Sequence, residues 1–357
     1  MVDVGELAQM LAARAPALAA ELLPGGRKEG PEWRCGGLDG RRGQSLAVHL
    51  QGAKAGVWAD FASGERGDAL DLVAQALFGG DKREAIRWAR SWLGLDGGDP
   101  ARLQATRRAV AEQATRSADE DAAGRKRALA LWLSGQASLR GTLAEAYLAG
   151  RGIRLEDLGR QPRALRYLAG CWCQERRREA PALLAAVVDP ATGQHLATHR
   201  TYLGRRADGS VGKADIGAAK KVLGRYRGGI IPLARGASGK SLREAPAGEL
   251  LCLSEGIEDG LTVALAKPAW RVAAMISVSN AHAVRLPSSI REIVIAGQLD
   301  APGSPADRAL RAAASHWLEE GRVVRLPVPP GWWRAQKVKD VNDLLQAAGA
   351  KEGAVNG

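Results

Sequence analysis

Short apolar runs and stretches of helical periodicity alternate along the C-terminal part of the chain. Each apolar run is bounded by glycine, proline or charged residues, which is the pattern of a buried strand. Strands that alternate with helices at this spacing predict βαβ units and a largely parallel sheet, and therefore an α/β fold. The expected strands are 249–254, 271–278, 291–297 and 322–328.

The clearest helix is expected between the last two of these strands. Ser304 is a candidate N-cap, Pro305 occupies the first helical position, and Gly321 ends the segment. Apolar residues recur there at helical spacing, so one face of the helix should pack against the sheet. The residues of this stripe are Leu310, Ala313, Ala314, Trp317 and Leu318.

The N-terminal segment, residues 1–97, changes pattern within itself. An Ala/Leu-rich helix is followed by short runs and Gly-rich turns, which predict strands near Glu32, Gln44 and Gly56. From Asp68 the apolar period becomes helical, and two helices are expected. The segment is therefore interpreted as a small β-ribbon domain with two helices after it.

Further segments complete the chain. Residues 98–125 are polar and Ala-rich, without aromatic residues, and predict a linker or a solvated helix. Residues 126–245 begin as a helix and continue as strands of a mixed α+β subdomain, with a hairpin expected around Thr192-Gly193. The parallel-sheet domain is expected at 246–346 and a tail at 347–357.

Composition favours a polyanionic partner. The 357-residue chain carries a formal charge of +12. Within Arg200–Arg227, eight basic residues stand against two acidic ones, with glycines and tyrosines between them, which suits phosphate contacts and base stacking. No apolar run is long enough to span a membrane, and no secretory signal is visible. The four scattered cysteines do not form a disulfide framework, which favours a cytoplasmic protein.

Acidic residues follow the expected strands of the parallel sheet. Glu255 and Asp259 come after its first strand, and Asp300 comes after its third. Asp340 and Asp343 form a further cluster after the last strand. Because ligands of open α/β sheets bind beyond the carboxyl ends of the strands, these carboxylates are expected to converge there. Mg²⁺ or Mn²⁺ takes such oxygen ligands and leaves positions open for substrate phosphates.

These clusters resemble the motifs of the Toprim family, the metal-binding domain shared by bacterial-type DNA primases, topoisomerases and some nucleases. Glu-Gly-Ile-Glu-Asp (255–259) is similar to the first Toprim motif, which carries a catalytic glutamate. Gly297–Gly303 occupies the place of the family's Asp-x-Asp motif, and Lys339–Leu345 resembles the acidic segment of primases. The resemblance implies catalytic roles for Glu255, Asp259 and Asp300, and metal-binding roles for Glu255, Asp300, Asp340 and Asp343.

The resemblance extends upstream. Gly56–Leu72 is similar to the end of a primase zinc-binding domain, and segments between Arg200 and Leu233 look like the basic half of a primase-like core. It implies a primase-like protein of a phage or mobile element that makes short RNA on single-stranded DNA from NTPs, with a separate replicative helicase as a further partner. Candidate contacts to nucleic acid or nucleotide are Arg200, Lys213, Lys220, Lys221 and Arg227.

Gln298 departs from the family pattern, because it stands where the first aspartate of Asp-x-Asp is expected. Losing a carboxylate weakens the attraction for a metal ion, although a glutamine carbonyl can still be a ligand. Three functions stay open: a primase-like nucleotidyltransferase, a non-catalytic Toprim protein that binds DNA and recruits a helicase, and a Toprim nuclease. The basic segment favours a primase over a nuclease, and Gln298 favours a binding protein over both.

The N-terminal domain lacks the four ligands of a structural zinc site, since Cys35 and His49 are its only Cys and His residues. We therefore expect a zinc-ribbon-like fold that contains no zinc. Aromatic residues and leucines would have to form the core in place of the metal. The residues expected to do so are Trp33, Trp58, Phe61 and nearby leucines.

Overall fold

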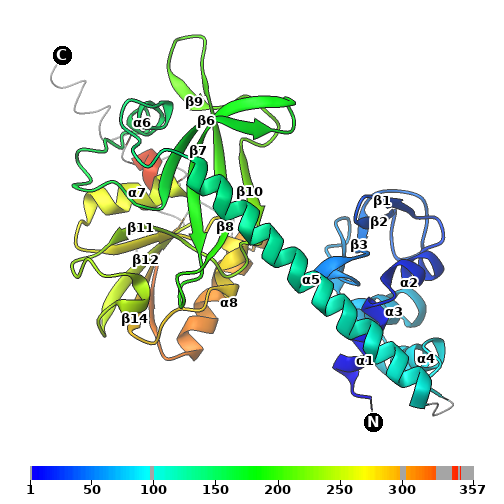
Figure 1. Ribbon diagram of the computed structural model, residues 1–357. Helices are drawn as coiled ribbons and strands as arrows, with labels where there is room; N and C mark the ends of the chain where they lie inside the picture. Colours follow the sequence, from blue (N-terminus) through cyan, green and yellow to red (C-terminus); the bar gives the residue numbers. More distant parts are fainter. Residues whose placement is uncertain (1, 97–99, 298–302, 327–339, 345, 347–357) are drawn as a thin grey trace. The chain divides into compact units, whose positions relative to one another are not determined.

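The chain folds as two compact units in the computed structural model, which describes residues 2–96, 100–297, 303–326, 340–344 and 346. The N-terminal unit is Met1–Ala122, and the C-terminal unit is Ala123–Gly357. Each has its own apolar core. Helix α5 (Pro100–Ser134) begins in the first unit and ends in the second (Figure 1).

The N-terminal unit is built on a five-stranded antiparallel meander in which each strand pairs with its neighbours in sequence. Glycine-rich turns keep these strands short, so most of the core comes from the helices that precede and follow them. The elements are α1 (Val4–Ala12), α2 (Ala15–Leu22), β1 (Arg27–Glu29), β2 (Glu32–Cys35), β3 (Leu46–His49), η1 (Gly52–Lys54), β4 (Trp58–Asp60), β5 (Arg66–Gly67), α3 (Ala69–Phe78) and α4 (Lys82–Trp92).

Trp58 is buried in this core and Trp33 is half-buried against it, as expected, but the expectation for Phe61 is wrong. The Phe61 side chain is 71% exposed. Residues alternate between the two faces of a strand, so Trp58 and Asp60 point inward while Phe61 points outward. The Phe61 ring lies against the guanidinium of Arg34 instead, 5.9 Å from its centroid.

The segment expected as a linker or a solvated helix is helical from Pro100 onward, within α5. Most side chains in the middle of this helix are exposed. Leu103 and Val110 pack on the core of the N-terminal unit, whereas Leu131 and Trp132 pack in the C-terminal unit. No helix among the described residues combines the length and the apolar character needed to cross a membrane.

The first sheet of the C-terminal unit is antiparallel, with strand order β10-β8-β7-β6 and β9 paired with β8. Strands β7 and β8 form the hairpin that the sequence predicts. One face of the sheet joins the largest core, and the other packs on the end of α5. The elements are α6 (Leu143–Ala149), β6 (Leu165–Cys173), β7 (Arg178–Val188), β8 (His195–Arg205), β9 (Val211–Lys213) and β10 (Lys220–Gly224).

The second sheet is largely parallel, as expected from the sequence, with an additional antiparallel strand at one edge. Its order is β11-β13-β12-β14-β15, with β11 antiparallel to β13 and the other strands parallel. Ser254 at the end of β12 pairs with Ala274 and Ala296, so three strands end level with one another. The elements are β11 (Ile231–Arg235), η2 (Leu242–Glu244), β12 (Glu249–Ser254), α7 (Ile257–Ala266), β13 (Arg271–Ala274), η3 (Val278–Ala283), β14 (Ile290–Ala296), α8 (Pro305–Glu319) and β15 (Val323–Arg325).

Two local expectations for this sheet are wrong. The strand expected at 271–278 ends at Ala274, because Ile276 adopts a left-handed conformation (φ 74°) that cannot continue a strand. Leu318, which is expected in the buried stripe of α8, is 55% exposed. At about 100° of rotation per residue, Leu318 lies roughly 100° from Trp317 and 140° from Ala313, which are the buried residues of this helix. Ser304 does cap α8, since its hydroxyl accepts a hydrogen bond from the Asp307 amide.

Candidate functional site

The turn from β12 into α7 brings two carboxylates under the start of the helix. Gly256 is the N-cap of α7, and Glu258 and Asp259 lie in its first turn, both buried. A Cβ atom at Gly256 would stand 3.1 Å from an Asp259 oxygen and 3.3 Å from a Glu258 oxygen. Glycine is therefore the residue that lets both acidic side chains pack beneath this turn. Glu255, which precedes it, is half-buried.

Glu258 is the centre of a polar cluster, the Glu258 cluster, that joins the two sheets of the C-terminal unit. The Tyr147 hydroxyl of α6 donates a 2.5 Å hydrogen bond to Glu258 Oε1. Lys213 Nζ of β9 lies 3.4 Å from the same oxygen, and Lys220 Nζ of β10 lies 3.3 Å from Oε2. The Glu258 side chain is 8% exposed, whereas the two lysines are 42% and 41% exposed. The cluster thus has a buried negative centre and a positive rim that reaches solvent.

The protonation states follow from this arrangement. Burial by itself would raise the pKa of the Glu258 carboxyl, but Lys220, Lys213 and the Tyr147 hydroxyl outweigh it and hold that pKa well below its usual range. Burial and the Glu258 charge raise the pKa of Tyr147, so its hydroxyl stays a donor. Burial lowers the pKa of Lys213, although Glu258 opposes this shift. One carboxylate and two ammonium groups leave a net charge of about +1, which is suited to an anion.

His199 on β8 borders the same cluster. It is 5% exposed, and its Nδ1 atom finds no hydrogen-bond partner among the residues that the structure describes. Burial lowers the pKa of His199 to about 4, with Lys220 contributing as a neighbouring cation. The imidazole is therefore neutral near pH 7 and adds no charge to the cluster.

The last acidic segment docks on the same helix. The Asn342 amide donates to Asp259 Oδ1 at 3.2 Å, and the Asn342 side chain donates to Thr262 of α7 and to the Arg151 carbonyl. Asp340 accepts a hydrogen bond from the Asp343 amide, and Asp343 pairs with Arg151 at 3.7 Å. The segment that carries Asp340 and Asp343 is thus held against the first turn of α7.

Strand alternation separates the candidate basic residues. Lys213 and Lys220 belong to the Glu258 cluster. Lys221 points to the opposite face of β10, beside Arg200, and forms an ion pair with Glu175. Arg200 donates to the Tyr202 hydroxyl at 3.2 Å. Arg227 is exposed beside His282. The five candidates therefore do not form one surface.

Residues that the sequence reasoning missed do much of the positioning. The sequence pattern favours Glu255 and Asp259, which are four residues apart, and gives Glu258 no role of its own. Tyr147, Arg151 and His199 come from segments without a motif. The available signal was the additional acidic residue, Glu258, in Glu-Gly-Ile-Glu-Asp.

The structure describes three of the four expected metal ligands, namely Glu255, Asp340 and Asp343. Gln298 and Asp300 lie outside the described residues. In the described part of the chain, no three His, Cys, Asp or Glu residues come together as metal ligands. In the N-terminal unit, Cys35 pairs with Leu46 and His49 with Glu32, so the two lie at opposite ends of the β2–β3 ladder. That this unit contains no zinc stays a prediction.

Two segments of the chain match known families. Residues 122–233 match a domain of unknown function (DUF7146), which covers α6 and the antiparallel sheet up to β11. Residues 250–351 match the Toprim domain. No curated protein sequence matches the chain.

Three solved structures are similar to the chain at low identity. The primase fragment of the bacteriophage T7 primase-helicase protein is 18% identical, over 57% of this chain and 70% of that one, with a TM-score of 0.35. The Aquifex aeolicus primase (zinc binding and RNA polymerase domains) is 16% identical, over 95% and 84%, with a TM-score of 0.34. A DNA primase domain from Pseudomonas aeruginosa is 16% identical, over 63% and 74%, with a TM-score of 0.40.

The Toprim match coincides with the parallel sheet and the site at its edge. It begins within β12, includes Glu255, Glu258 and Asp259, and extends through the segment of Asp340 and Asp343. The motif resemblance, the βαβ topology and the family match therefore agree on the same residues. Residues 250–351 are therefore similar to the Toprim domain in their motifs and in their family match, and the described part of this segment has the parallel sheet expected of it.

Proposed function

We propose that this protein is a primase-like nucleotidyltransferase that makes short RNA on single-stranded DNA. The observation that carries the proposal is the Glu258 cluster, in which two half-exposed lysines stand beside the acidic edge of a Toprim domain. Phosphoryl and nucleotidyl transfer need carboxylates next to cations that bind phosphate, because charge develops on both reacting oxygens and on the leaving group.

The proposed metal ligands are carboxylates of the Toprim domain. Glu255 and Asp340 would hold Mg²⁺ or Mn²⁺ together with Asp300, and these hard oxygen donors suit either ion. Asp259 and Asp343 would assist through their contacts with Asn342 and Arg151. When bound, the ion would activate the primer 3′-hydroxyl for attack on the α-phosphorus and would neutralise the charge on the pyrophosphate that leaves.

The two lysines of the cluster would bind the phosphates of the incoming NTP. Each ammonium group contacts Glu258, and each lysine side chain is about 40% exposed, so it can also contact a ligand from the solvent. Because Glu258 is buried and ionised, it orients both lysines before the substrate arrives, and less side-chain entropy is lost on binding. Glu258 is therefore a positioning residue in this proposal. Lys221, Arg200 and Arg227 lie elsewhere and would contact the template strand.

The test is a priming assay on single-stranded DNA with labelled NTPs and Mg²⁺ or Mn²⁺. The variant Glu255→Gln should abolish the products while DNA affinity stays within about twofold of wild type, because one neutral side chain replaces a metal ligand. The matched control is Glu292→Gln, the same change near the other end of the neighbouring strand β14. This control should retain wild-type activity.

A second candidate function is a non-catalytic Toprim protein that binds DNA and recruits a helicase. Gln298 supports it, because a glutamine stands where the family has an aspartate. No products from the wild type, with salt-sensitive DNA binding intact and no cleavage, would favour that function. Template degradation that depends on Glu255 would make the protein a Toprim nuclease instead.

A further inference from the structure

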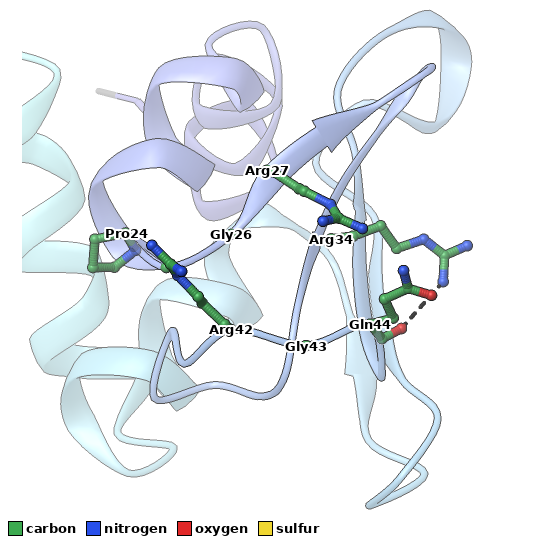
Figure 2. Close-up of a pocket in the computed structure, with 8 residues that line it drawn as sticks. Pro24, Gly26, Arg27, Arg34, Arg42, Gly43 and Gln44 are labelled. Atoms are coloured by element: carbon green, nitrogen blue, oxygen red, sulfur yellow. Dashed lines mark hydrogen bonds between the residues drawn. The ribbon is translucent and has the colours of Figure 1, made fainter.

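A cleft of about 540 Å³ opens in the N-terminal unit between the β1–β2 hairpin and the loop that precedes β3. Figure 2 shows the side chains that surround it. Three arginines line this arginine cleft, and none of the residues that line it is acidic. The lining residues are Pro24, Gly25, Gly26, Arg27, Arg34, Arg42, Gly43 and Gln44.

Two of the arginines stand directly opposite each other on neighbouring strands. Arg27 of β1 pairs with Arg34 of β2 in the antiparallel register. Like charges at opposed positions repel and destabilise a ladder, and here each arginine is partly neutralised by a glutamate, Glu29 for Arg27 and Glu32 for Arg34. Those glutamates are themselves a directly opposed pair at the turn end of the hairpin. The charges of the hairpin are thus sorted by sign, with the positive end at the cleft.

The backbone beneath the cleft is fixed by close packing. Trp33 precedes Arg34 in β2 and points to the other face, where its indole N–H donates to the Leu23 carbonyl at 3.1 Å. A Cβ atom at Gly26 would stand 2.1 Å from that indole nitrogen, and one at Gly25 would stand 2.3 Å from the Gly40 carbonyl oxygen. The two strands therefore hold the Arg27 and Arg34 backbones at a fixed separation.

Arg42 supplies the third guanidinium, from the loop that precedes β3. Figure 2 shows its side chain extending toward Pro24. Within the described part of the chain, the Arg42 side chain forms no hydrogen bond or ion pair, whereas its neighbour Arg41 pairs with Asp39 at 2.9 Å. Three arginines and two glutamates leave a net charge of about +1 at the cleft, and Arg42 accounts for the excess.

We propose that the arginine cleft binds phosphate groups. Guanidinium groups match phosphate oxygens in geometry as well as charge, and an anion between Arg27 and Arg34 would relieve their repulsion. The phosphates can come from the backbone of a nucleic-acid strand or from the phosphate chain of a free nucleotide. The proposal concerns the N-terminal unit and does not depend on chemistry at the Toprim domain.

The experiment measures the binding of a labelled single-stranded DNA oligonucleotide to the full chain across a range of salt concentrations. Arg42→Gln should weaken binding about fivefold at 0.1 M salt and should reduce the slope of log K against log salt by about 0.7, because one phosphate contact is lost. Arg41→Gln is the matched control, since Arg41 is next in sequence, equally charged and outside the cleft. It should keep the wild-type slope.

A second arm titrates ATP and inorganic tripolyphosphate into the same variants by calorimetry. A change confined to this arm would assign the cleft to a nucleotide, and a change in the DNA slope would assign it to a strand. The proposal would be overturned if Arg42→Gln and Arg27→Gln both showed the same affinities as Arg41→Gln, for DNA and for the nucleotide ligands alike. Neither arm needs RNA synthesis, so inactivity at Glu255 would leave this result standing. Thermal unfolding of each variant shows whether the fold is intact.

Discussion

In the C-terminal unit one buried carboxylate is shared by two lysines, whereas in the N-terminal unit each arginine of the β1–β2 hairpin has its own glutamate. The Glu258 side chain is 8% exposed. The Arg27 side chain is 68% exposed and its partner Glu29 is 38% exposed. Both places carry a net positive charge of about one, but water screens the Arg27–Glu29 pair and is nearly excluded from Glu258.

The difference teaches that the same pairing has two distinct uses. A buried carboxylate must keep its partners, because an unpaired buried charge is costly, so Glu258 ties the strands that carry Lys213 and Lys220 to α7. The exposed Arg27–Glu29 pair contributes little to stability, so in the proposed cleft Arg27 would lose little by exchanging its glutamate for a phosphate. The buried Glu258 arrangement holds its lysines in fixed positions, whereas the exposed pair of the hairpin leaves its arginine able to move.

The largest effect is expected when both lysines are removed. The double variant Lys213→Met, Lys220→Met leaves Glu258 buried without cations, and the C-terminal unit should lose about 3–5 kcal/mol of stability at pH 7. Hydrogen exchange of β7 and β8 measures this loss. Because the Glu258 pKa would then rise above its unfolded value, the variant should regain stability as the pH falls through that raised pKa.

The control for this variant is Lys221→Met, which removes an adjacent lysine on the other face of β10. Its partner Glu175 is half-exposed, and the exchange rates should stay close to those of the wild type. Equal losses in the control and the double variant would mean that β10 is sensitive to any substitution. The burial of Glu258 would then not be the cause.

The fold could be predicted from the sequence to a larger extent than the site. The parallel sheet followed from apolar runs, and the α8 N-cap followed from Ser304 and Pro305, because these signals are local in sequence. The exposure of Phe61 was predictable in principle from strand alternation with Trp58, but only once the strand's bounds were known.

The site was harder to predict because its contacts are distant in sequence. Glu258 meets Tyr147 across 111 residues and Lys220 across 38. Sequence spacing favoured Lys213, Lys220 and Lys221 equally, since a basic run has no sign of which side chain faces which sheet. The register of β10 against β8 decides that, and it depends on packing of the whole C-terminal unit.

A second, smaller effect is expected on the stability of the C-terminal unit when the pH is lowered, because His199 is buried. Because the pKa of His199 falls to about 4 on folding, only the unfolded chain binds this proton between pH 6.5 and 4. The stability contributed by neutral His199 is therefore complete above pH 6.5 and is lost as the pH falls toward 4, by about 3 kcal/mol in all. The charged groups that face it are Lys220, Glu258, Arg200 and Lys213, and ionised Glu258 loses stability in the same direction below pH 4.5.

The prediction is checked by measuring the free energy of urea unfolding at pH 7, 5.5 and 4.5. Hydrogen exchange of β8 then shows whether the loss of stability is local to this strand. His199→Gln should flatten the dependence on pH in that window, because the titrating group is gone. His282→Gln makes the same change at an exposed position and should keep the wild-type slope. A slope unchanged in His199→Gln would assign the acid sensitivity to other groups.

The smallest effect is expected at the hairpin, with Arg27→Gln. The change removes one exposed ion pair, with Glu29, and also removes the repulsion between Arg27 and Arg34 across the ladder. These two contributions have opposite signs, so the stability of the N-terminal unit should change by less than about 0.5 kcal/mol, as measured by hydrogen exchange of β1 and β2. A loss of several times that size would show that Arg27 holds the hairpin together. The two units would then use their charges in the same way, and a merely structural role would account for the arginines.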